Sequence, residues 1–154
     1  MGRIAVAILA VLCLSRAARA ESESRGIVFT ELLGKGGLYG VGYDHPLVRR
    51  LDVGAVASYL VLDGQRVTTF APYARFAVAG DRNRLYLDFG PQLVRVATPS
   101  PVPEWMGTAS TGIGTQLSAG YEHRGRLVFR AFAMTTVGRS GIAPWLGLDV
   151  GWSL

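Results

Sequence analysis

The sequence lacks most of the side chains that redox and metal chemistry use. It contains one cysteine and two histidines among 154 residues. The cysteine, Cys13, lies in an N-terminal segment that we expect to be cleaved, so the mature chain has none. Disulfides, thiolate metal sites and cysteine nucleophiles are therefore excluded together, and we expect no cofactor.

The mature chain also has little net charge. The whole sequence carries 16 basic and 11 acidic residues, a formal charge of +5. Removing Arg3, Arg16 and Arg19 with the N-terminal segment leaves 13 basic against 11 acidic residues. The arginines are scattered and cluster only in turns, without the basic stripe that nucleic-acid binding requires. We therefore expect no nucleic-acid partner.

The apolar run at the N-terminus is too short for a membrane-spanning helix, which needs about 20 residues. It covers residues 4–14, follows the positive charge of Arg3 and precedes the small side chains of Ala18 and Ala20. These features are typical of a secretory signal peptide, so we predict cleavage after Ala20. The chain is thereby divided into a signal peptide (1–20), a short segment (21–25) and one domain (26–154).

No window of the mature chain keeps the 3.6-residue apolar period of a helix, whereas several windows alternate with period two. The alternation predicts eight strands, at residues 26–34, 38–44, 51–62, 66–78, 85–96, 112–123, 127–137 and 143–154. Short turns rich in glycine separate most of them and favour antiparallel hairpins. The longer connection 97–111 carries Pro99, Pro101 and Pro103, which remove backbone donors and predict an exposed loop.

The two faces of these strands differ in a way that indicates a membrane barrel. In strand 38–44, tyrosine and valine alternate with glycine and aspartate, and strands 112–123 and 143–154 repeat the pattern. A face exposed to water would be rich in Lys, Glu and Arg, but this polar face holds mostly Gly, Ser, Gln and single acids. Such residues suit a crowded lumen, with the apolar face toward lipid. We predict an all-β, eight-stranded antiparallel up-and-down (meander) transmembrane β-barrel.

Two groups of residues follow from this orientation of the strands. Charged residues on the inward face should pair with one another as a polar network in the lumen: Glu31, Asp44, Arg75, Asp88, Glu122, Arg130 and Asp149. The same charges could instead line a narrow ion path, but a lumen of eight strands is usually filled. Outward aromatic residues should form a girdle at the membrane interfaces: Tyr39, Tyr43, Tyr59, Tyr121 and Trp152.

Residues 34–43, Gly-Lys-Gly-Gly-Leu-Tyr-Gly-Val-Gly-Tyr, look like the first hairpin of the small eight-stranded outer-membrane β-barrels of Gram-negative bacteria. The chain resembles this family over the whole mature sequence, and it ends within its last strand as family members do. The resemblance implies insertion into the cell outer membrane by the outer-membrane assembly machinery, with both termini periplasmic and loop 97–111 outside the cell. Family members commonly end on an aromatic residue, whereas Leu154 ends this chain and Trp152 lies two positions earlier.

We therefore expect a non-enzymatic, porin-like barrel with a filled lumen and a structural or surface-interaction role, in contact with outer-membrane lipids and monomeric. Trp105 and Met106, in the proline-rich loop, are the expected contact residues outside the cell. One alternative is a secreted or periplasmic soluble barrel that binds a small apolar ligand.

A second alternative is an enzyme that modifies lipid A as a deacylase, with a nucleophilic serine beside a histidine. Ser58 and Ser118 are expected to point inward, but neither has a His-Ser signature nearby in the sequence. His45 and His123 end strands that lie four strands apart, on opposite walls of the barrel. We expect neither a shared metal site nor catalysis from them.

Overall fold

The computed structural model of the protein describes residues 26–100, 107–138 and 141–154. Its eight strands are β1 (Ile27–Gly34), β2 (Gly37–Val48), β3 (Leu51–Leu62), β4 (Gln65–Ala79), β5 (Asn83–Thr98), β6 (Thr108–Arg124), β7 (Leu127–Gly138) and β8 (Gly141–Ser153). The expected signal peptide (1–20), the segment 21–25 and the contact residues Trp105 and Met106 lie outside the described residues. Within the described ranges, no helix is long and apolar enough to cross a membrane.

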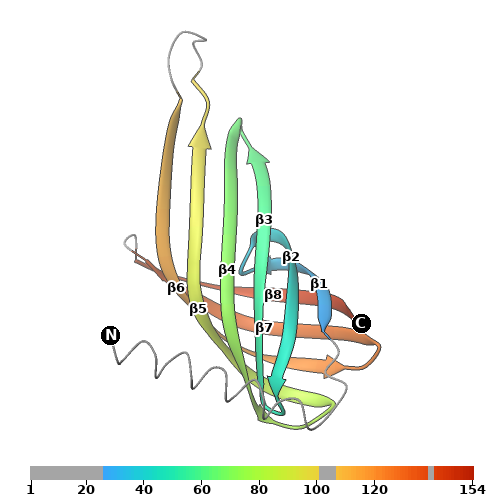
Figure 1. The fold of residues 1–154 in the computed structure, drawn as a ribbon. Coiled ribbons are helices and arrows are strands. Elements are labelled where there is room, and N and C mark those ends of the chain that lie inside the picture. Colours follow the sequence, from blue (N-terminus) through green and yellow to red (C-terminus); the bar gives the residue numbers. More distant parts are fainter. Residues whose placement is uncertain (1–25, 101–106, 139–140) are drawn as a thin grey trace, which may run out of the picture.

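The strands form one closed antiparallel barrel in sequence order (Figure 1). Each strand pairs with its neighbours in the chain, and β1 also pairs with β8, with Ile27 opposite Ser153 and Leu32 opposite Leu148. Closure leaves β1 and β8 without the unpaired edges that an open sheet would expose there. The predicted all-β, eight-stranded meander barrel is therefore confirmed.

Several strands are longer than the sequence pattern indicated. Strand β2 continues to Val48 through Pro46, where the pairing with β3 shifts at a bulge. Strands β5 and β6 stay paired up to Thr98 and Thr108, so the connection between them is shorter than the predicted loop 97–111. The added β6 residues are small and exposed, and they lack the apolar alternation on which the prediction rested.

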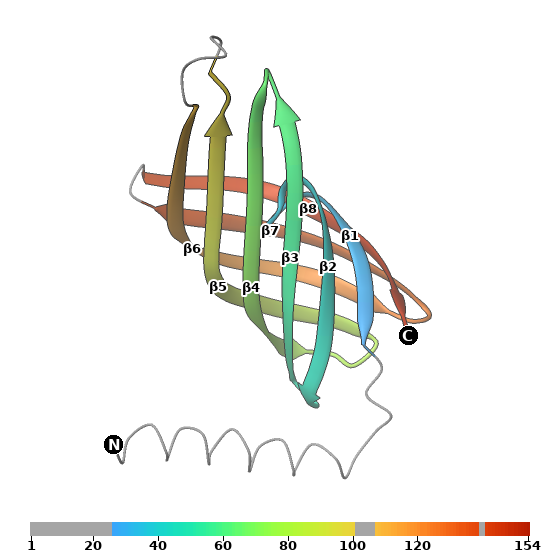
Figure 2. The ribbon, with the colours of Figure 1, turned by 45° about the horizontal axis from the view of Figure 1, so that its top comes forward.

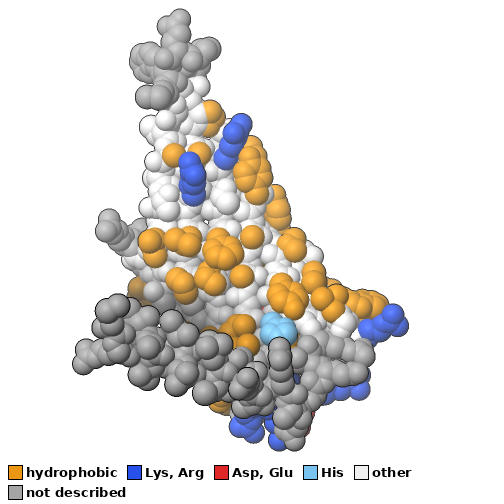
Figure 3. All heavy atoms as spheres, in the orientation of Figure 1, with side chains coloured by type: hydrophobic (Ala, Val, Ile, Leu, Met, Phe, Trp, Pro, Cys, Tyr) orange, Lys and Arg blue, Asp and Glu red, His pale blue; other side chains and the backbone are white. Residues whose placement is uncertain are grey.

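Side chains alternate between the lumen and the outer wall along every strand. On β5, Tyr86, Asp88 and Gln92 are buried inside, while Leu87 and Phe89 are exposed outside. Hydrophobic side chains gather across the middle of the wall formed by β3 to β6 (Figure 3). The glycine-and-acid face of the strands points toward the barrel axis, as the sequence predicted.

The outward positions of three neighbouring strands carry no charge over nine residues. These stretches are 70–78 on β4, 85–93 on β5 and 113–121 on β6. The residues of the three stretches pair with one another across the strands, with Phe70 opposite Leu93 and Leu93 opposite Ile113. A tilted strand needs about 9 to 11 residues to cross the hydrocarbon core of a membrane, so the lengths match.

Strands β3 to β6 extend beyond the rest of the barrel at one end (Figures 1 and 2). We call this end, which carries the β3–β4 turn, the loop end, and the opposite end, which carries Ile27 and Ser153, the terminal end. Pairing of β2 with β3 reaches only Ala57, and pairing of β6 with β7 begins only at Thr115. The extension, which we call the protruding sheet, comprises residues 58–62, 65–69, 94–98 and 108–114.

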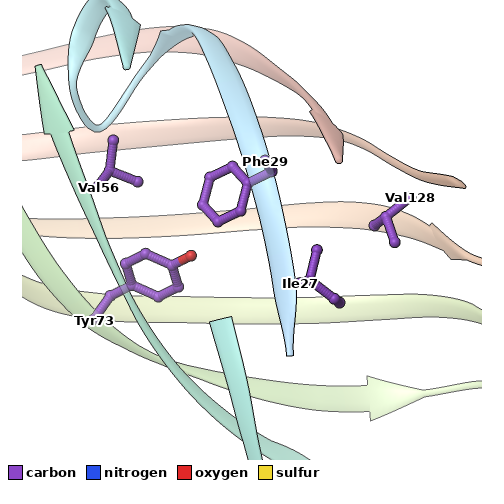
Figure 4. Close-up of a cluster of buried hydrophobic side chains, with 5 residues drawn as sticks. All are labelled: Ile27, Phe29, Val56, Tyr73 and Val128. Atoms are coloured by element: carbon purple, nitrogen blue, oxygen red, sulfur yellow. The ribbon is translucent and has the colours of Figure 1, made fainter. Parts of the chain in front are cut away.

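The lumen contains hydrophobic side chains as well as charged ones. Ile27, Phe29, Val56, Tyr73 and Val128 come from four strands and point into the barrel (Figure 4). A second buried group consists of Tyr86, Phe132 and Met134. Inward glycines make room for these rings rather than only for carboxylates. A Cβ atom on Gly120 would lie 2.6 Å from Phe132 Cβ, and one on Gly151 would lie 2.7 Å from Phe29 Cβ.

Candidate functional site: a charged network in the lumen

The structure places all seven residues of the expected lumen network inside the barrel. Each is at most 2 % exposed to solvent. They come from seven of the eight strands and meet at the middle of the lumen: Glu31, Asp44, Arg75, Asp88, Glu122, Arg130 and Asp149. Charges buried to this degree need direct partners, because removing an ion from water costs several kcal/mol.

Arg130 joins three carboxylates. Its Nε atom lies 2.6 Å from Glu122 Oε2, its Nη2 atom 2.5 Å from Asp44 Oδ2, and its Nη1 atom 3.3 Å from Asp149 Oδ2. The three acids lie on β2, β6 and β8, and Arg130 itself lies on β7. One guanidinium therefore connects four strands across the lumen, which its planar array of five N–H donors makes possible.

Arg75 forms the second centre of the network. Its Nε and Nη2 atoms donate to the two oxygens of Asp88, at 2.8 and 2.9 Å, a bidentate arrangement. Its Nη1 atom donates to Asp44 Oδ2 at 2.9 Å and to Glu122 Oε2 at 3.4 Å. Asp44 and Glu122 are thus shared between Arg75 and Arg130, and the two guanidinium groups belong to one network.

Lys35 completes the network, although the period-two pattern of the sequence does not indicate it. It lies in the β1–β2 turn, but its side chain is fully buried, and its Nζ atom lies 3.1 Å from Asp88 Oδ2 and 3.6 Å from Glu31 Oε2. Its backbone carbonyl accepts a hydrogen bond from Gln92 Nε2 at 2.7 Å. The turn therefore folds over the lumen at the loop end. Lys35 is the only lysine of the chain, and that isolation in a glycine-rich turn is the one signal that could have found it.

Two further arginines extend the network to the terminal end. Arg124 donates to Glu122 Oε1 at 2.7 Å and to Asp52 Oδ2 at 2.5 Å. Arg84 lies 3.7 Å from the same oxygen of Asp52. A chain of ion pairs consequently runs from Lys35 at one mouth of the barrel to Arg84 at the other.

Aromatic rings cover the cationic groups of the network. Lys35 Nζ lies 4.2 Å from the ring centre of Phe132, the guanidinium carbon of Arg75 lies 4.3 Å from that of Tyr86, and Arg130 lies 4.8 Å from that of Phe29. A ring face attracts a cation most strongly where water is excluded. The glycines that admit these rings therefore serve the charged network as well.

Outside the barrel, the five expected girdle residues are all exposed on the wall. Tyr43 and Trp152 both stand opposite Val28 at the terminal end, and Arg126 lies 4.6 Å from the Trp152 ring. Tyr121 is on the same end of β6, where its hydroxyl donates to Asn83. Tyr39 and Tyr59 meet nearer the loop end, where the Tyr39 hydroxyl donates to the Tyr59 carbonyl at 2.6 Å. The tyrosines and Trp152 thus divide between the two ends.

The histidines and inward serines do not meet in the described part of the chain. His45 contacts the Tyr43 hydroxyl at 3.4 Å, and His123 contacts Asn83 at 2.7 Å. The Ser58 hydroxyl donates to the Gly36 carbonyl. Among the residues that the structure describes, no group of three or more His, Cys, Asp or Glu side chains is arranged to hold a metal ion.

Comparison with known proteins extends the assignment of the fold. No protein-family model matches the chain, and no curated protein does. Among solved structures, the N-terminal β-barrel domain of Pseudomonas aeruginosa OprF superposes with a TM-score of 0.64 at 14% identity, covering 84% of this chain and 96% of that one. The Yersinia pestis attachment invasion locus protein Ail, solved in complex with the heparin analogue sucrose octasulfate, gives 0.54 at 11% identity, covering 85% and 97%.

The chain therefore has the fold of the small eight-stranded outer-membrane β-barrels, as its first hairpin and strand pattern indicated. Identities of 14% and 11% establish the fold alone and carry no ligand or activity across to this protein.

Proposed function

We propose that the protein is a non-enzymatic, integral barrel of the cell outer membrane, with a filled lumen and a structural or surface-interaction role. The observation that carries this proposal is the nine-residue uncharged stretch on the outer wall of β4, β5 and β6. Large hydrophobic side chains are exposed along it, among them Phe76, Phe89 and Leu117. An outer wall that is apolar over this length is stable in contact with lipid.

The lumen supports a structural role rather than transport. Lys35, Arg75 and Arg130 each contact at least two carboxylates, so the middle of the barrel is occupied by ion pairs. A soluble barrel that carries a small apolar ligand would need the opposite arrangement, with apolar side chains lining an internal cavity. The charged network instead ties strands together across the lumen and fixes the shape of the barrel.

The protruding sheet supports a role at the cell surface. With the termini on the periplasmic side, the loop end and the protruding sheet face outward from the cell. Residues 108–114 of β6 pair with β5 alone among the described residues, so their other edge is open to a partner.

Fractionation tests the membrane assignment. The protein should stay with carbonate-washed outer membranes and migrate differently on a gel with and without heating, because a folded barrel resists detergent. A soluble barrel would be released by carbonate, and release would refute the proposal.

Single cysteines test the orientation, because the expected mature chain has none of its own. Gln65→Cys at the loop end and Arg82→Cys at the terminal end are matched exposed positions beside turns. A membrane-impermeant maleimide on intact cells should label the cysteine at position 65 and leave the cysteine at position 82 unlabelled until the cells are opened. The reverse pattern would place the protruding sheet in the periplasm.

A further inference from the structure

Two arginines lie on the outer wall where the uncharged stretch ends. At the loop end, the last apolar row across β3 to β6 consists of paired residues Ala57, Phe70, Leu93 and Ile113. The next outward row consists of Tyr59, Thr68, Arg95 and Thr111, each opposite its neighbour on the adjoining strand. Arg66 follows one row further out, between Val61 and Ala97.

Arg66 and Arg95 differ from the lumen arginines in having no acidic partner among the described residues. Both are exposed, and no carboxylate of the described chain pairs with them. Figure 3 shows two basic side chains beyond the hydrophobic band on the wall that β4 and β5 form. On the outward face of these two strands, the basic residues of the described chain are Arg66 and Arg95. Their charge is thus free to meet a ligand outside the barrel.

The positions of the two side chains suit a single anionic group. Arg95 stands opposite Thr68, and Arg66 stands opposite Ala97, so the arginines are diagonal neighbours on adjacent strands. Diagonal neighbours lie about 7–8 Å apart, a separation that two long side chains bridge easily. A guanidinium binds phosphate through two parallel N–H donors, and the hydroxyls of Thr68 and Thr111 lie in the same row as Arg95.

The position of Arg66 and Arg95 relative to the uncharged stretch indicates which anion they meet. An arginine within the hydrocarbon would cost about 2–4 kcal/mol, whereas one at the interface costs little. Arg95 is the first charged outward residue beyond residues 85–93 of β5, whose outward side chains are all uncharged. A barrel embedded along that stretch carries both guanidinium groups at the level of the lipid headgroups, whose phosphates supply the missing anion.

We propose that Arg66 and Arg95, assisted by the hydroxyls of Thr68 and Thr111, form a site for the phosphate of a lipid headgroup in the leaflet that faces the loop end. The site rests on the proposed membrane insertion for its physiological role. Its chemistry is separable from insertion, because the folded protein in detergent presents the same two arginines.

The test is lipid binding to the full mature barrel in detergent, followed by native mass spectrometry. Lipid A with two phosphates is the probe, and lipid A with one phosphate is the comparison. We expect the double variant Arg66→Gln/Arg95→Gln to bind the diphosphorylated lipid at least tenfold more weakly. The matched control is Arg50→Gln/Arg82→Gln, which removes the same charge from exposed turns at the terminal end and should bind like the unaltered protein.

Each outcome decides the proposal. Equal binding by the Arg66/Arg95 variant and the control variant would overturn it, as would equal loss in both, which would show a general effect of net charge. Inorganic phosphate that displaces the lipid at equimolar concentration would make the site one for free phosphate and not for a headgroup. Carbonate extraction of the same proteins reports insertion separately, so a barrel that fails to insert but still binds lipid A refutes only the membrane assignment.

Discussion

The barrel body comprises all eight strands, whereas the protruding sheet continues only β3 to β6, and charged residues lie on different faces in the two regions. In the body, the inward face holds the ion-pair network and the outward face is apolar. In the protruding sheet, the inward face carries the half-buried Leu60, Val67, Val94 and Val96, while Arg95 and Thr111 point outward. The backbone alternation runs through both regions without a break. Strand geometry therefore determines only which residues share a face. Which face is polar depends on what surrounds the strands at each position along the barrel axis.

The largest difference between the two regions is expected when one arginine is removed from each. Arg130→Met should destabilise the barrel by about 3–5 kcal/mol, because Asp149 and Asp44 lose a buried partner. Arg66→Met in the protruding sheet should leave the free energy of unfolding almost unchanged, because that side chain is exposed and has no carboxylate partner among the described residues. Urea unfolding in lipid vesicles, followed by tryptophan fluorescence, measures both. Equal losses would show that the network does not stabilise the lumen.

The outer wall gives the second contrast, on a single strand. Leu117 stands at the centre of the uncharged stretch 113–121 of β6, and Ala109 points outward in the protruding sheet. Leu117→Arg should cost about 2–4 kcal/mol of stability in vesicles, and Ala109→Arg no more than about 1 kcal/mol. The same unfolding measurement applies. If the two variants were equally stable, residues 113–121 would not lie in hydrocarbon.

Crowding in the lumen gives a smaller contrast between two inward glycines. A Cβ atom on Gly147 would lie 2.5 Å from Phe132 Cε2, whereas one on Gly112, in the protruding sheet, would meet only Val94 O at 3.9 Å. Gly147→Ala should therefore destabilise by about 1–3 kcal/mol through overpacking. Gly112→Ala should be neutral or slightly stabilising. Adding Phe132→Leu to Gly147→Ala should restore part of the loss; no recovery would mean that the ring is not the obstacle.

Period-two alternation was enough to predict the barrel and the inward position of the charged residues. It works because a strand sends successive side chains to opposite faces, so one acid among glycines and serines marks the lumen face. Asp88 and Glu122 could be assigned in this way. The partners of each charge could not, because Arg130 reaches acids on β2, β6 and β8 that are up to 86 residues distant in the chain.

Two features escaped the sequence pattern for physical reasons. Lys35 lies in a turn, where alternation gives no direction, and only the folding of that turn over the lumen buries its amine. The change of polarity in the protruding sheet is visible in the sequence as apolar residues on the inward parity, such as Leu60 and Val94. The sequence does not show how far each strand pairs with its neighbours. These residues therefore weaken the period-two pattern and do not mark where the barrel body ends.

The smallest expected effect concerns the junction where the two regions meet. The β2–β3 ladder ends with Val41 opposite Ala57, and beyond it the Tyr39 hydroxyl donates to the Tyr59 carbonyl at 2.6 Å. This side-chain hydrogen bond connects β2 to β3 where backbone pairing between them has ended, and we expect it to hold the β3 edge of the protruding sheet against the barrel body. Tyr39→Phe should lower overall stability by only about 0.5–1.5 kcal/mol.

The Tyr39→Phe substitution should change amide hydrogen exchange only locally. Amide hydrogens of residues 59–62 should exchange faster in the Tyr39→Phe variant, while those around Asp44 in the body keep their protection, because loosening of the protruding sheet does not open the barrel. Tyr43→Phe is the control, since its hydroxyl makes only the 3.4 Å contact with His45. If exchange rose equally in the body and in the protruding sheet, the two would unfold as one cooperative unit. The two regions would then differ in polarity but not in local stability.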